Sequence, residues 1–525
     1  MKKNCCLLIL LLVQSVVTFA QNQNISNYIF GDTEPYIAVN PTNPSNVIAA
    51  WIKVTGFTQG SIAMSYSNDA GVTWSAPQNA PHFSTTFTSA DPSIDFNASG
   101  KAFLTYVDYK LSMDSGKVLI ISSANGGQTW SGAVQVIDGL ETADLPVDRP
   151  WVAVDRSGGM FDGRVYVTSK NYENGITTNH VYMKYSSDDG ATWSPLDILD
   201  DSLPTDLVTS MGALAIGADG SINVSYFSWH LPLSFALRVV LVKSMDGGVT
   251  FTPHIMAVAP AGSGINDTLQ FGSTLSANPA NAQNLVFTYT SGVNGDADIL
   301  SINSSDGGIT WSSANPVPVN DDALGNGNEQ DMSWAGFSPN GMYCVAWRDR
   351  RNSGDDAVSP FEIWATASYN GGVTFGQNVL VSSVLSPDIP IQKGNDFIGL
   401  AASNTFLHIN WCDYRAGNYE IFYNHDSLSS VVHVEQRPDA KPVVSAFPNP
   451  FTERITFSYF LPADQLNSTI EITDVNGKLV RTVFTGTQSA GQHEVVIDGN
   501  TLAAGIYFFT ISGTNWKSVT EFIRE

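Results

Sequence analysis

The sequence predicts an all-β protein, a multi-bladed β-propeller followed by a small antiparallel β-sandwich. Three observations predict this fold. A motif of eight residues recurs about every 60 residues over most of the chain. Strand-like segments separated by Gly, Pro and Asn follow one another closely, and helical periodicity is lacking. The composition changes after residue 430, where a polar stretch with prolines precedes a new set of strands.

Residues 1–20 predict a cleavable signal peptide. Lys2 and Lys3 precede an apolar run from Leu7 to Phe19, and Ala20 stands before a polar stretch. No later run reaches the roughly 20 apolar residues that a spanning helix needs, so no transmembrane segment is expected. We therefore expect a protein that is exported through the periplasm.

The chain is acidic, with 25 Lys and Arg against 49 Asp and Glu and a formal net charge of −24. Such a surface repels nucleic acid and anionic membranes, whose binding requires Lys or Arg clusters that this sequence lacks. Cys5 and Cys6 lie in the predicted signal peptide, and Cys344 and Cys412 lie in apolar strands of different repeats. Two buried free thiols are favoured there over a disulfide.

The repeated motif has the pattern Ser-x-Asp/Asn-x-Gly-x-Thr-Trp/Phe. Its six copies begin at Ser67, Ser123, Ser186, Ser244, Ser304 and Ser368. The Asp or Asn side chain accepts N–H groups of its own turn, the Gly supplies a positive φ, and the Thr and the aromatic residue open the next strand. This pattern predicts a structural role for the third residue of each copy: Asp69, Asn125, Asp188, Asp246, Asp306 and Asn370.

A second repeated unit, two apolar strands joined by a polar turn, stands upstream of each motif. Its seven copies begin at Pro35, Pro92, Pro150, Gly212, Ser273, Ser333 and Asp396. The seventh copy continues into a strand at residues 419–423 that reaches a degenerate motif at Asp426. The strand pairs favour seven blades and the motifs favour six. We prefer seven, because residues 396–426 would otherwise be an unexplained half-blade.

Over residues 28–430 these repeats resemble the Asp boxes, or bacterial neuraminidase repeats, of the sialidase-like propeller superfamily. The resemblance implies the propeller fold. It leaves the function open, because the superfamily includes sialidases, other glycosidases and propellers that only bind.

A linker is expected at residues 431–444, and residues 445–525 predict the small sandwich. The pair Asn476-Gly477 suits a type I′ turn between strands at 470–473 and 479–484. This segment resembles the C-terminal sorting domain of type IX secretion substrates, with Pro-Asn-Pro at 448–450, Asp-x-x-Gly-Lys at 474–478 and Gly-x-Tyr at 505–507. The resemblance implies the type IX secretion machinery as a partner, and release from or attachment to the outer cell surface. An ordinary carbohydrate-binding sandwich is the alternative.

Functional groups are expected where first strands begin and second strands end, because both points lie on the propeller face opposite to the motif turns. Three second strands end in aromatic-x-Asp-x-Lys/Arg, at residues 106–110, 347–351 and 411–415. Carboxylates, guanidinium groups and aromatic rings together suit sugars. The expected substrate-binding residues are Glu34, Asp91, Arg149, Trp229, Arg351, Asp413 and Arg415, and the expected catalytic residues are Asp349 and Glu329. The alternative for the strand-end Asp and Arg residues is ion pairing at the rim.

The resemblance also implies how a sialidase of this superfamily works: three Arg residues bind the substrate carboxylate, a Tyr activated by Glu attacks, and an Asp serves as acid and base. The first of these Arg residues opens the first blade in an Arg-Ile-Pro motif, but this chain has Thr33-Glu34-Pro35 there. Arg149, Arg351 and Arg415 are the remaining guanidinium groups for such a set.

The predicted function is a secreted or cell-surface propeller that binds glycans. A sialidase-type, exo-acting glycoside hydrolase and a protein-interaction scaffold are the alternatives. We expect a monomer without a cofactor, since no His and Cys cluster has metal-ligand spacing and a structural calcium among the Asp-rich loops lacks a complete ligand motif.

Overall fold

A computed structural model of the chain describes residues 22–28, 30–55, 59–112, 114–139, 147–171, 180–203, 206–230, 236–259, 272–353, 359–388, 397–428, 444–461, 465–475, 477–489, 491–513 and 517–525. These residues are almost entirely strands and turns, with short 3-10 helices at Leu199–Ser202 and Gly499–Thr501. The all-β prediction is confirmed. The predicted signal peptide and most of the predicted linker lie outside the described residues.

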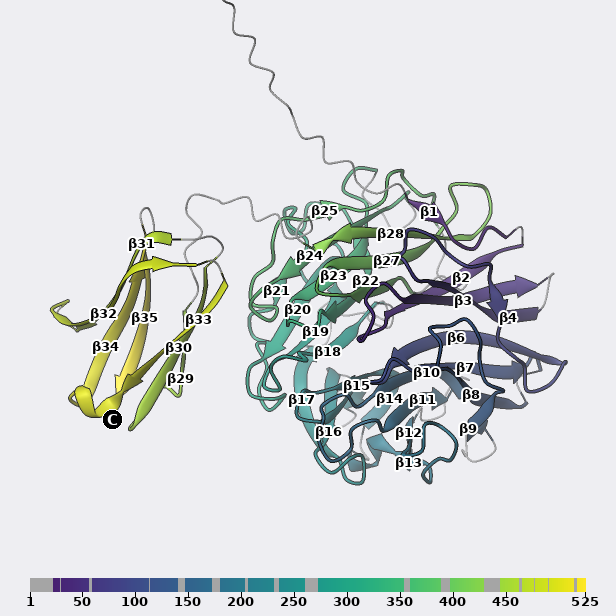
Figure 1. The fold of residues 1–525 in the computed structure, drawn as a ribbon, viewed down its shortest axis with the longest axis horizontal. Coiled ribbons are helices and arrows are strands. Elements are labelled where there is room, and N and C mark those ends of the chain that lie inside the picture. The colour runs from purple at the N-terminus through teal and green to yellow at the C-terminus, as the bar shows by residue number, and fades with distance from the viewer. Residues whose placement is uncertain are drawn as a thin grey trace, which may run out of the picture.

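Up to residue 427 the described strands form seven four-stranded antiparallel sheets, which we call blades 1 to 7 (Figure 1). Blade 1 contains β2 (Asp32–Val39), β3 (Val47–Thr55), β4 (Gln59–Ser67) and β5 (Gln78–Asn79). Blade 2 contains β6 (Phe87–Phe96), β7 (Ala102–Lys110), β8 (Gly116–Ser123) and β9 (Val134–Asp138). Blade 3 contains β10 (Val147–Val154), β11 (Val165–Asn171), β12 (Val181–Ser186) and β13 (Asp197–Ile198).

Blade 4 contains β14 (Asp206–Ile216), β15 (Ile222–His230), β16 (Ala236–Ser244) and β17 (Thr252–Ala259). Blade 5 contains β18 (Thr274–Ala277), β19 (Leu285–Ser291), β20 (Asp298–Ser304) and β21 (Val317–Pro318). Blade 6 contains β22 (Gln330–Phe337), β23 (Tyr343–Asp349), β24 (Glu362–Ser368) and β25 (Val379–Leu380). Blade 7 contains β26 (Gly399–Ala402), β27 (Phe406–Asp413), β28 (Glu420–Ser427) and, from the start of the chain, β1 (Gln23–Asn24).

The blades follow one another around a common channel. The first strand of each blade contacts the first strand of the next, and β26 of the last blade contacts β2 of the first. Middle strands are buried on both sides, because each blade lies between two neighbours. On β3, Val47, Ala49 and Trp51 belong to one hydrophobic cluster, whereas Ile48 and Ala50 belong to another. The apolar runs of the sequence therefore come from strands that face two cores.

Blade 7 takes its outer strand from the beginning of the chain. β1 pairs with β28, and the Ile25 N–H donates to the Ile421 carbonyl at 2.9 Å. In the other blades a motif turn joins the third strand to the fourth, but in blade 7 the fourth strand comes from elsewhere. This arrangement explains why seven sheets accompany six motifs. It also differs from the expected domain boundary, because the sheet begins before residue 28.

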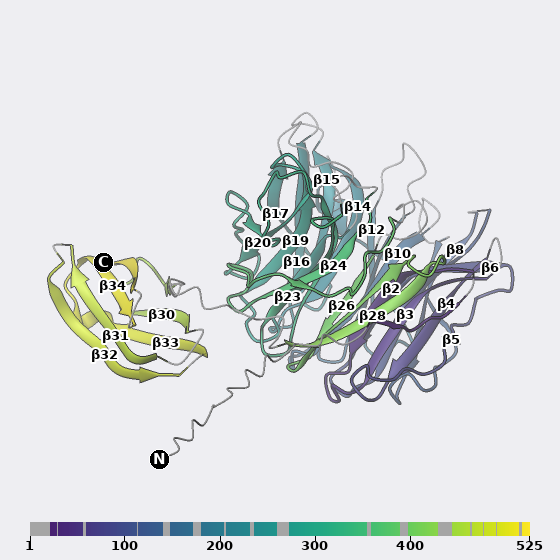
Figure 2. The same cartoon turned by 90° about the horizontal axis from the view of Figure 1, so that it is seen from above.

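The C-terminal segment folds around its own core (Figures 1 and 2). One sheet contains β29 (Val444–Phe447), β30 (Arg454–Leu461) and β33 (Gly491–Asp498), and the other contains β31 (Gln465–Asp474), β32 (Leu479–Gln488), β34 (Gly505–Ser512) and β35 (Lys517–Arg524). Phe457 and Phe509, one from each sheet, stack with ring centroids 4.0 Å apart. The hairpin between β31 and β32 forms as expected, with Gly477 at φ 76°.

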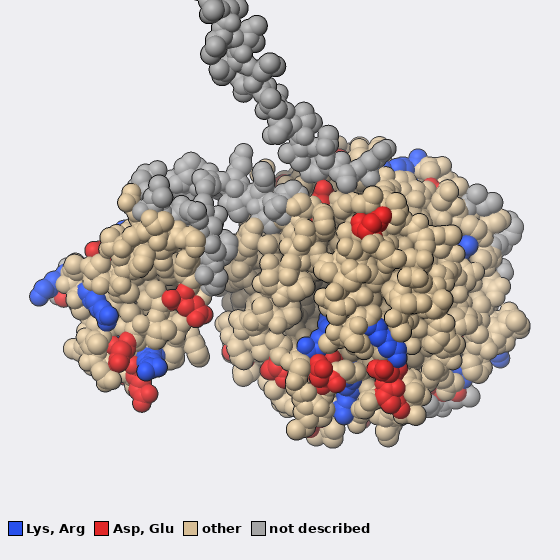
Figure 3. All heavy atoms as spheres, viewed as in Figure 1, with Lys and Arg blue, Asp and Glu red and all other residues tan. Residues whose placement is uncertain are grey.

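Three further features concern the surface, the thiols and the length of the helices. Figure 3 shows a face on which charged side chains are sparse, and in the lower half of the propeller basic groups lie beside acidic ones. Cys344 and Cys412 are both free and buried, as the sequence favoured. None of the helices in the described part of the chain is long and apolar enough to cross a membrane.

Candidate functional site

The six motif turns lie on one face of the propeller. Each motif follows a third strand, next to the turn between the first two strands of a blade. In blade 1 the Ala70 N–H of the motif donates to the Ser45 carbonyl of that turn at 2.8 Å. We call this side the box face. First strands begin and second strands end on the opposite side, which we call the mouth face.

The motif residues make the turn contacts that the sequence predicts. Asp188 accepts the Ser186 hydroxyl at 2.7 Å, the Thr192 N–H at 2.8 Å and the Thr192 hydroxyl at 2.6 Å. The bonds from Thr192, followed by the bond from Ser186, lower the pKa of Asp188 to about 2. Asn125 accepts the equivalent N–H and donates to the Thr129 hydroxyl. The motif residues thus hold turns.

A strained backbone position recurs at the mouth face. Glu34, Asp91, Arg149 and Met332 have φ values of 50°, 54°, 47° and 49°. Each lies at an irregularity in the pairing of a first strand with a second strand. A left-handed residue other than Gly costs about 1–3 kcal/mol and persists only where its surroundings hold it. Three of the predicted binding residues therefore occupy one special position, and Met332 is a fourth member that the sequence analysis missed.

An aromatic cluster fills the channel beside these residues. Tyr36, Trp151 and Trp334 each stand two residues after a left-handed position, and Phe397 joins them from the start of blade 7. The Trp151 and Trp334 ring centroids are 5.3 Å apart, and Phe397 lies 5.6 Å from Trp151 and 5.8 Å from Trp334. The Arg149 guanidinium lies 5.0 Å from the centre of the Phe397 ring. A charged group thus sits over a rigid apolar floor.

Two of the left-handed residues also contact each other between blades. The Arg149 N–H donates to the Asp91 carboxylate at 3.3 Å. Asp148 lies 3.9 Å from Arg149 and 3.8 Å from the ammonium of Lys170. Glu34 and Asp91 are 7% and 9% exposed, so their carboxylates lie within the wall of the mouth and not on its rim.

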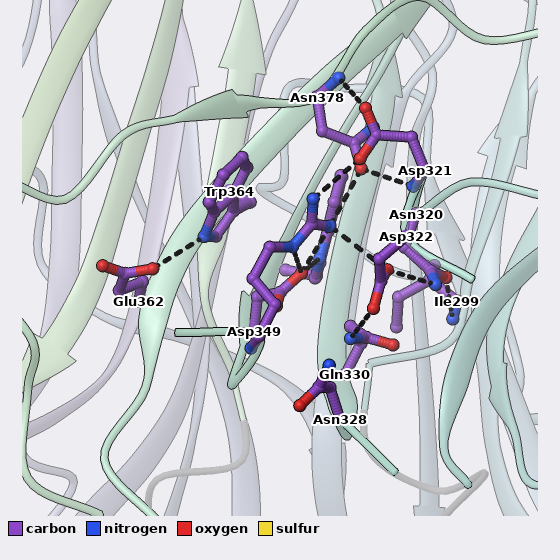
Figure 4. A network of polar contacts seen from close by, with 12 residues as sticks. Ile299, Asn320, Asp321, Asp322, Asn328, Gln330, Asp349, Glu362, Trp364 and Asn378 are labelled. Carbon is purple, nitrogen blue, oxygen red and sulfur yellow. Dashed lines mark hydrogen bonds and ion pairs between the residues drawn. The ribbon is translucent and has the colours of Figure 1, made fainter. Parts of the chain in front are cut away.

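Arg351 is enclosed by carboxylates of its own chain. Its guanidinium donates to Asp349 at 2.8 Å, to Asp321 at 2.7 Å and to Asn378 at 3.0 Å. It also stacks on Trp364 at 4.1 Å. Figure 4 shows Asp321, Asp322, Asp349 and Asn378 in this network. This arrangement corresponds to the ion-pair alternative for the strand-end residues.

Blade 7 repeats the same arrangement. Arg415 donates to Asp413 at 2.6 Å and stacks on Phe422 at 4.4 Å. The Trp411 indole donates to the same carboxylate oxygen at 2.8 Å, as Trp347 does to Asp349 in blade 6. Of the three guanidinium groups expected to gather around a ligand, only Arg149 lies against the aromatic cluster.

The remaining predicted residues lie apart from that cluster. The Glu329 carbonyl accepts the Arg350 N–H at 3.1 Å, so Glu329 stands at the start of β22 on the mouth face. Trp229 packs against the hydrophobic cluster that contains Phe227 and Phe287, between blades 4 and 5.

Two buried arginines were not assigned a role from the sequence. Arg348 is 2% exposed and donates to both oxygens of Asp331, at 2.6 and 2.5 Å. Arg350 is fully buried, 3.3 Å from Asp331 and 3.5 Å from Asp388. Burial alone would raise the pKa of Asp331, but the two arginines outweigh it and hold that pKa below its usual value. The only sequence signal was three Arg residues within four positions at the end of β23.

A cavity of about 370 Å³ occupies the other half of the channel. All seven first strands contribute to its wall, and Asp95, Arg156 and Ser157 line it near the box face. None of the predicted catalytic or substrate-binding residues lines this cavity. In the part of the chain that the structure describes, no group of three or more His, Cys, Asp or Glu side chains is placed to hold a metal ion.

Two protein-family models match parts of the chain. A BNR repeat-like domain matches residues 112–337, which lie within the propeller, and a FlgD Ig-like domain matches residues 451–517, which lie within the C-terminal sandwich. No curated protein matches the chain.

Several solved structures resemble the chain at low identity. The Hadza microbial sialidase Hz136 is 14% identical with a TM-score of 0.43, and the match covers 72% of this chain and 75% of that one. An α-L-arabinanase of Penicillium chrysogenum is 14% identical with a TM-score of 0.44, covering 79% and 99%. A protein of unknown function from Dyadobacter fermentans DSM 18053 is 14% identical with a TM-score of 0.44, covering 67% and 98%. Likeness at this level says nothing about the ligand or the reaction.

Proposed function

We propose that this protein is an exported, seven-bladed, sialidase-like propeller that binds glycans at the mouth face and lacks sialidase catalysis. The observation that carries the proposal is the recurrent left-handed position. Glu34, Asp91 and Arg149 lie at strained bulges in the first strands of three blades, and the Arg149 guanidinium lies over Phe397 of the aromatic cluster. Backbone strain that recurs around a channel mouth is typical of positions selected for function rather than for stability.

The chemistry of these groups suits a sugar. The carboxylates accept hydrogen bonds from hydroxyl groups, and the Arg149 guanidinium donates to hydroxyl or carboxylate oxygens. The rings of Trp151, Trp334 and Phe397 are at most 9% exposed, so the floor is fixed before any ligand arrives. A rigid site loses little entropy on binding, which favours affinity for a polar ligand.

The pairing of the other arginines argues against sialidase chemistry. A substrate carboxylate would have to compete with Asp349 and Asp321 for Arg351, and with Asp413 for Arg415. Breaking a partly buried pair leaves an uncompensated charge and costs several kcal/mol. Of these three arginines only Arg149 lies against the aromatic cluster, whereas the mechanism implied by the superfamily needs three such groups around the ligand.

Glycan-array binding by the full chain tests the proposal, together with hydrolysis of a fluorogenic sialoside and a panel of neutral glycosides. We expect binding without turnover. Arg149→Gln should weaken binding about tenfold or more, because a charge-assisted hydrogen bond contributes about 1.5–3 kcal/mol. Arg164→Gln is the matched control, since Arg164 donates to Gly247 at the box face.

Two results would contradict this proposal. Sialoside turnover that disappears in Arg149→Gln would establish the hydrolase alternative. Glycan binding that is equally strong in both Arg variants would place the site elsewhere.

We further propose that residues 445–525 are a type IX sorting domain. Support comes from the motifs at 448–450, 474–478 and 505–507 and from the separate hydrophobic core of this unit. In a host with a type IX system, the full chain should reach the medium or cell surface, and a chain ending at residue 430 should remain in the periplasm. Equal export of the two chains would contradict the assignment.

A further inference from the structure

The strand-end aspartate of blade 2 has different partners from those of blades 6 and 7. Asp349 and Asp413 each accept an indole N–H and the guanidinium of an Arg two residues later. In blade 2 the aromatic residue is Tyr106, whose hydroxyl donates to Pro81 at 2.5 Å instead. The basic residue two positions after Asp108 is Lys110, which pairs with Asp114. Asp108 therefore contacts neither Tyr106 nor Lys110 in the way that Asp349 and Asp413 contact their Trp and Arg, and its partner is a histidine.

His82 links Asp108 to a serine of the neighbouring blade. Nδ1 of His82 lies 2.8 Å from Oδ1 of Asp108, and Nε2 lies 2.9 Å from the Oγ of Ser61. A carboxylate can only accept hydrogen bonds, so in neutral His82 the proton is on Nδ1. Nε2 then has a free lone pair that accepts the Ser61 hydroxyl. This order of groups matches an activated serine nucleophile.

The carboxylate of Asp108 is held by two further donors. The Phe83 N–H donates to Oδ2 at 2.7 Å, and the Ser89 hydroxyl donates to Oδ1 at 2.8 Å. Asp108 itself is fully buried. These bonds fix the orientation of the carboxylate, so it can hold the imidazole in one tautomer and stabilise an imidazolium.

Three separate elements supply the groups, and the site is open on the imidazole side. Ser61 belongs to β4 of blade 1, His82 to the segment between β5 and β6, and Asp108 to the end of β7. The His82 side chain is 18% exposed, and Ser61 is 7% exposed. The imidazole therefore borders solvent, whereas the positioning carboxylate is shielded from it.

We propose that Ser61, His82 and Asp108 form an acyl-transfer site that hydrolyses carboxylic esters. The Ser61 Oγ attacks the ester carbonyl carbon while His82 Nε2 takes the hydroxyl proton. The bond from the carbonyl carbon to the alcohol oxygen then breaks, and the alcohol leaves with that proton from His82. Water, activated by His82, attacks the acyl-serine, and the acid leaves as Ser61 recovers its proton.

The differences among the blades distinguish an acyl-transfer site from a polar contact that only joins two strands. In blades 6 and 7 the strand-end carboxylate is closed by an arginine, which tightens the rim but cannot move a proton. In blade 2 that group is replaced by an imidazole, the side chain suited to proton transfer near neutral pH. The imidazole in turn faces a hydroxyl, which a cross-link between strands does not need.

A fluorophosphonate probe and p-nitrophenyl acetate test the site on the full chain. We expect the probe to label Ser61, detected by peptide mass spectrometry, with fluoride as the leaving group. Ser61→Ala should lose both the label and ester hydrolysis. Ser65→Ala is the matched control, because Ser65 is a buried serine of the same strand that bonds to Ser75. This control should keep both activities.

Two further variants separate catalysis from structure. His82→Gln retains Ser61 but removes the base, so the labelling rate should fall at least about 100-fold and its dependence on pH should flatten. Asp108→Asn should slow labelling comparably while the thermal unfolding profile still shows a folded propeller. Absence of label on Ser61 in the wild-type chain, or equal hydrolysis by Ser61→Ala, would overturn the proposal.

Discussion

At the scale of single residues, repeated charged groups proved harder to interpret than repeated turn residues. The sequence pattern at 347–351 and 411–415 suited either a ligand site or an ion pair, because residues two apart on a strand share a side. The structure shows that each Arg folds back on its own Asp. At 106–110 the Tyr and Lys that replace Trp and Arg were the visible sign that Asp108 has other partners.

Asp32 provides a prediction about pH. Burial raises its pKa to about 6 from 3.8, against the lowering effect of bonds from Ser26 and Trp51. The folded state therefore binds this proton more tightly than the unfolded state, and the propeller should lose stability as pH rises from about 4 to 6. The loss at pH 7 is about 3 kcal/mol, from roughly two pKa units.

Asp32→Asn removes this titration, and the amide oxygen can still accept the Trp51 indole N–H, now 3.0 Å from Asp32. The free energy of unfolding of the variant minus that of the wild type should therefore increase by up to about 3 kcal/mol between pH 4 and pH 7. Chemical denaturation at both pH values measures it. A difference that does not change with pH would mean that Asp32 does not titrate in this range.

At the scale of elements, the motif turns were predictable and the bulges were not. Each residue of the motif has one local role, so the pattern predicts the turn without knowledge of its neighbours. The bulges place Glu34, Asp91 and Arg149 at positive φ, which propensity assigns to Gly or Asn. Only the proline that follows each of them marked the site. Tertiary contacts at the channel mouth, not local preference, impose that conformation.

Asp306 tests the structural role of the motif. Its carboxylate accepts the Ser304 hydroxyl at 2.8 Å and both the N–H and the hydroxyl of Thr310, at 2.9 and 2.6 Å. Asp306→Ala should destabilise the propeller by about 1–2 kcal/mol, because these donors lose their acceptor, and should leave glycan binding unchanged. Thermal unfolding and array binding measure the two effects.

Asp306→Asn is the matched control for that variant. Asn125 and Asn370 already make the equivalent contacts in their own motifs, with the amide donating to the Thr hydroxyl. The Asn variant should therefore stay close to wild type in stability. A loss of glycan binding in either variant, with the fold intact, would give the box face a functional role.

At the scale of the whole molecule, the number of blades depended on a contact between distant parts of the chain. Counting motifs suggested six blades, because blade 7 has no motif turn between its third and fourth strands. No local pattern indicates that the Gln23–Asn24 strand pairs with β28, since this short polar stretch only follows the predicted signal peptide. The first-strand repeats predicted the number of sheets better than the motifs did, because every blade has a first strand along the channel.

Because β1 pairs with β28 and completes blade 7, residues 23–26 are part of the propeller structure. Ile25 is 7% exposed and belongs to the hydrophobic cluster shared by blades 1, 6 and 7. Its N–H donates to Ile421 at 2.9 Å, and the Ser26 hydroxyl accepts the Ile421 N–H at 2.9 Å. β28, the strand that pairs with β1, also contacts β2 of blade 1, so loss of β1 should loosen the junction between blades 7 and 1.

Ile25→Ala should destabilise the propeller by about 2–4 kcal/mol and should increase amide hydrogen exchange in β28 and β2 before it does so in blade 4. Asn27→Gly is the matched control, because Asn27 is exposed at φ 47°, where Gly is tolerated. Hydrogen exchange followed by mass spectrometry resolves the affected strands. Uniform exchange across all blades would mean that the ring unfolds as one unit, and unchanged exchange in β28 would mean that β1 does not close it.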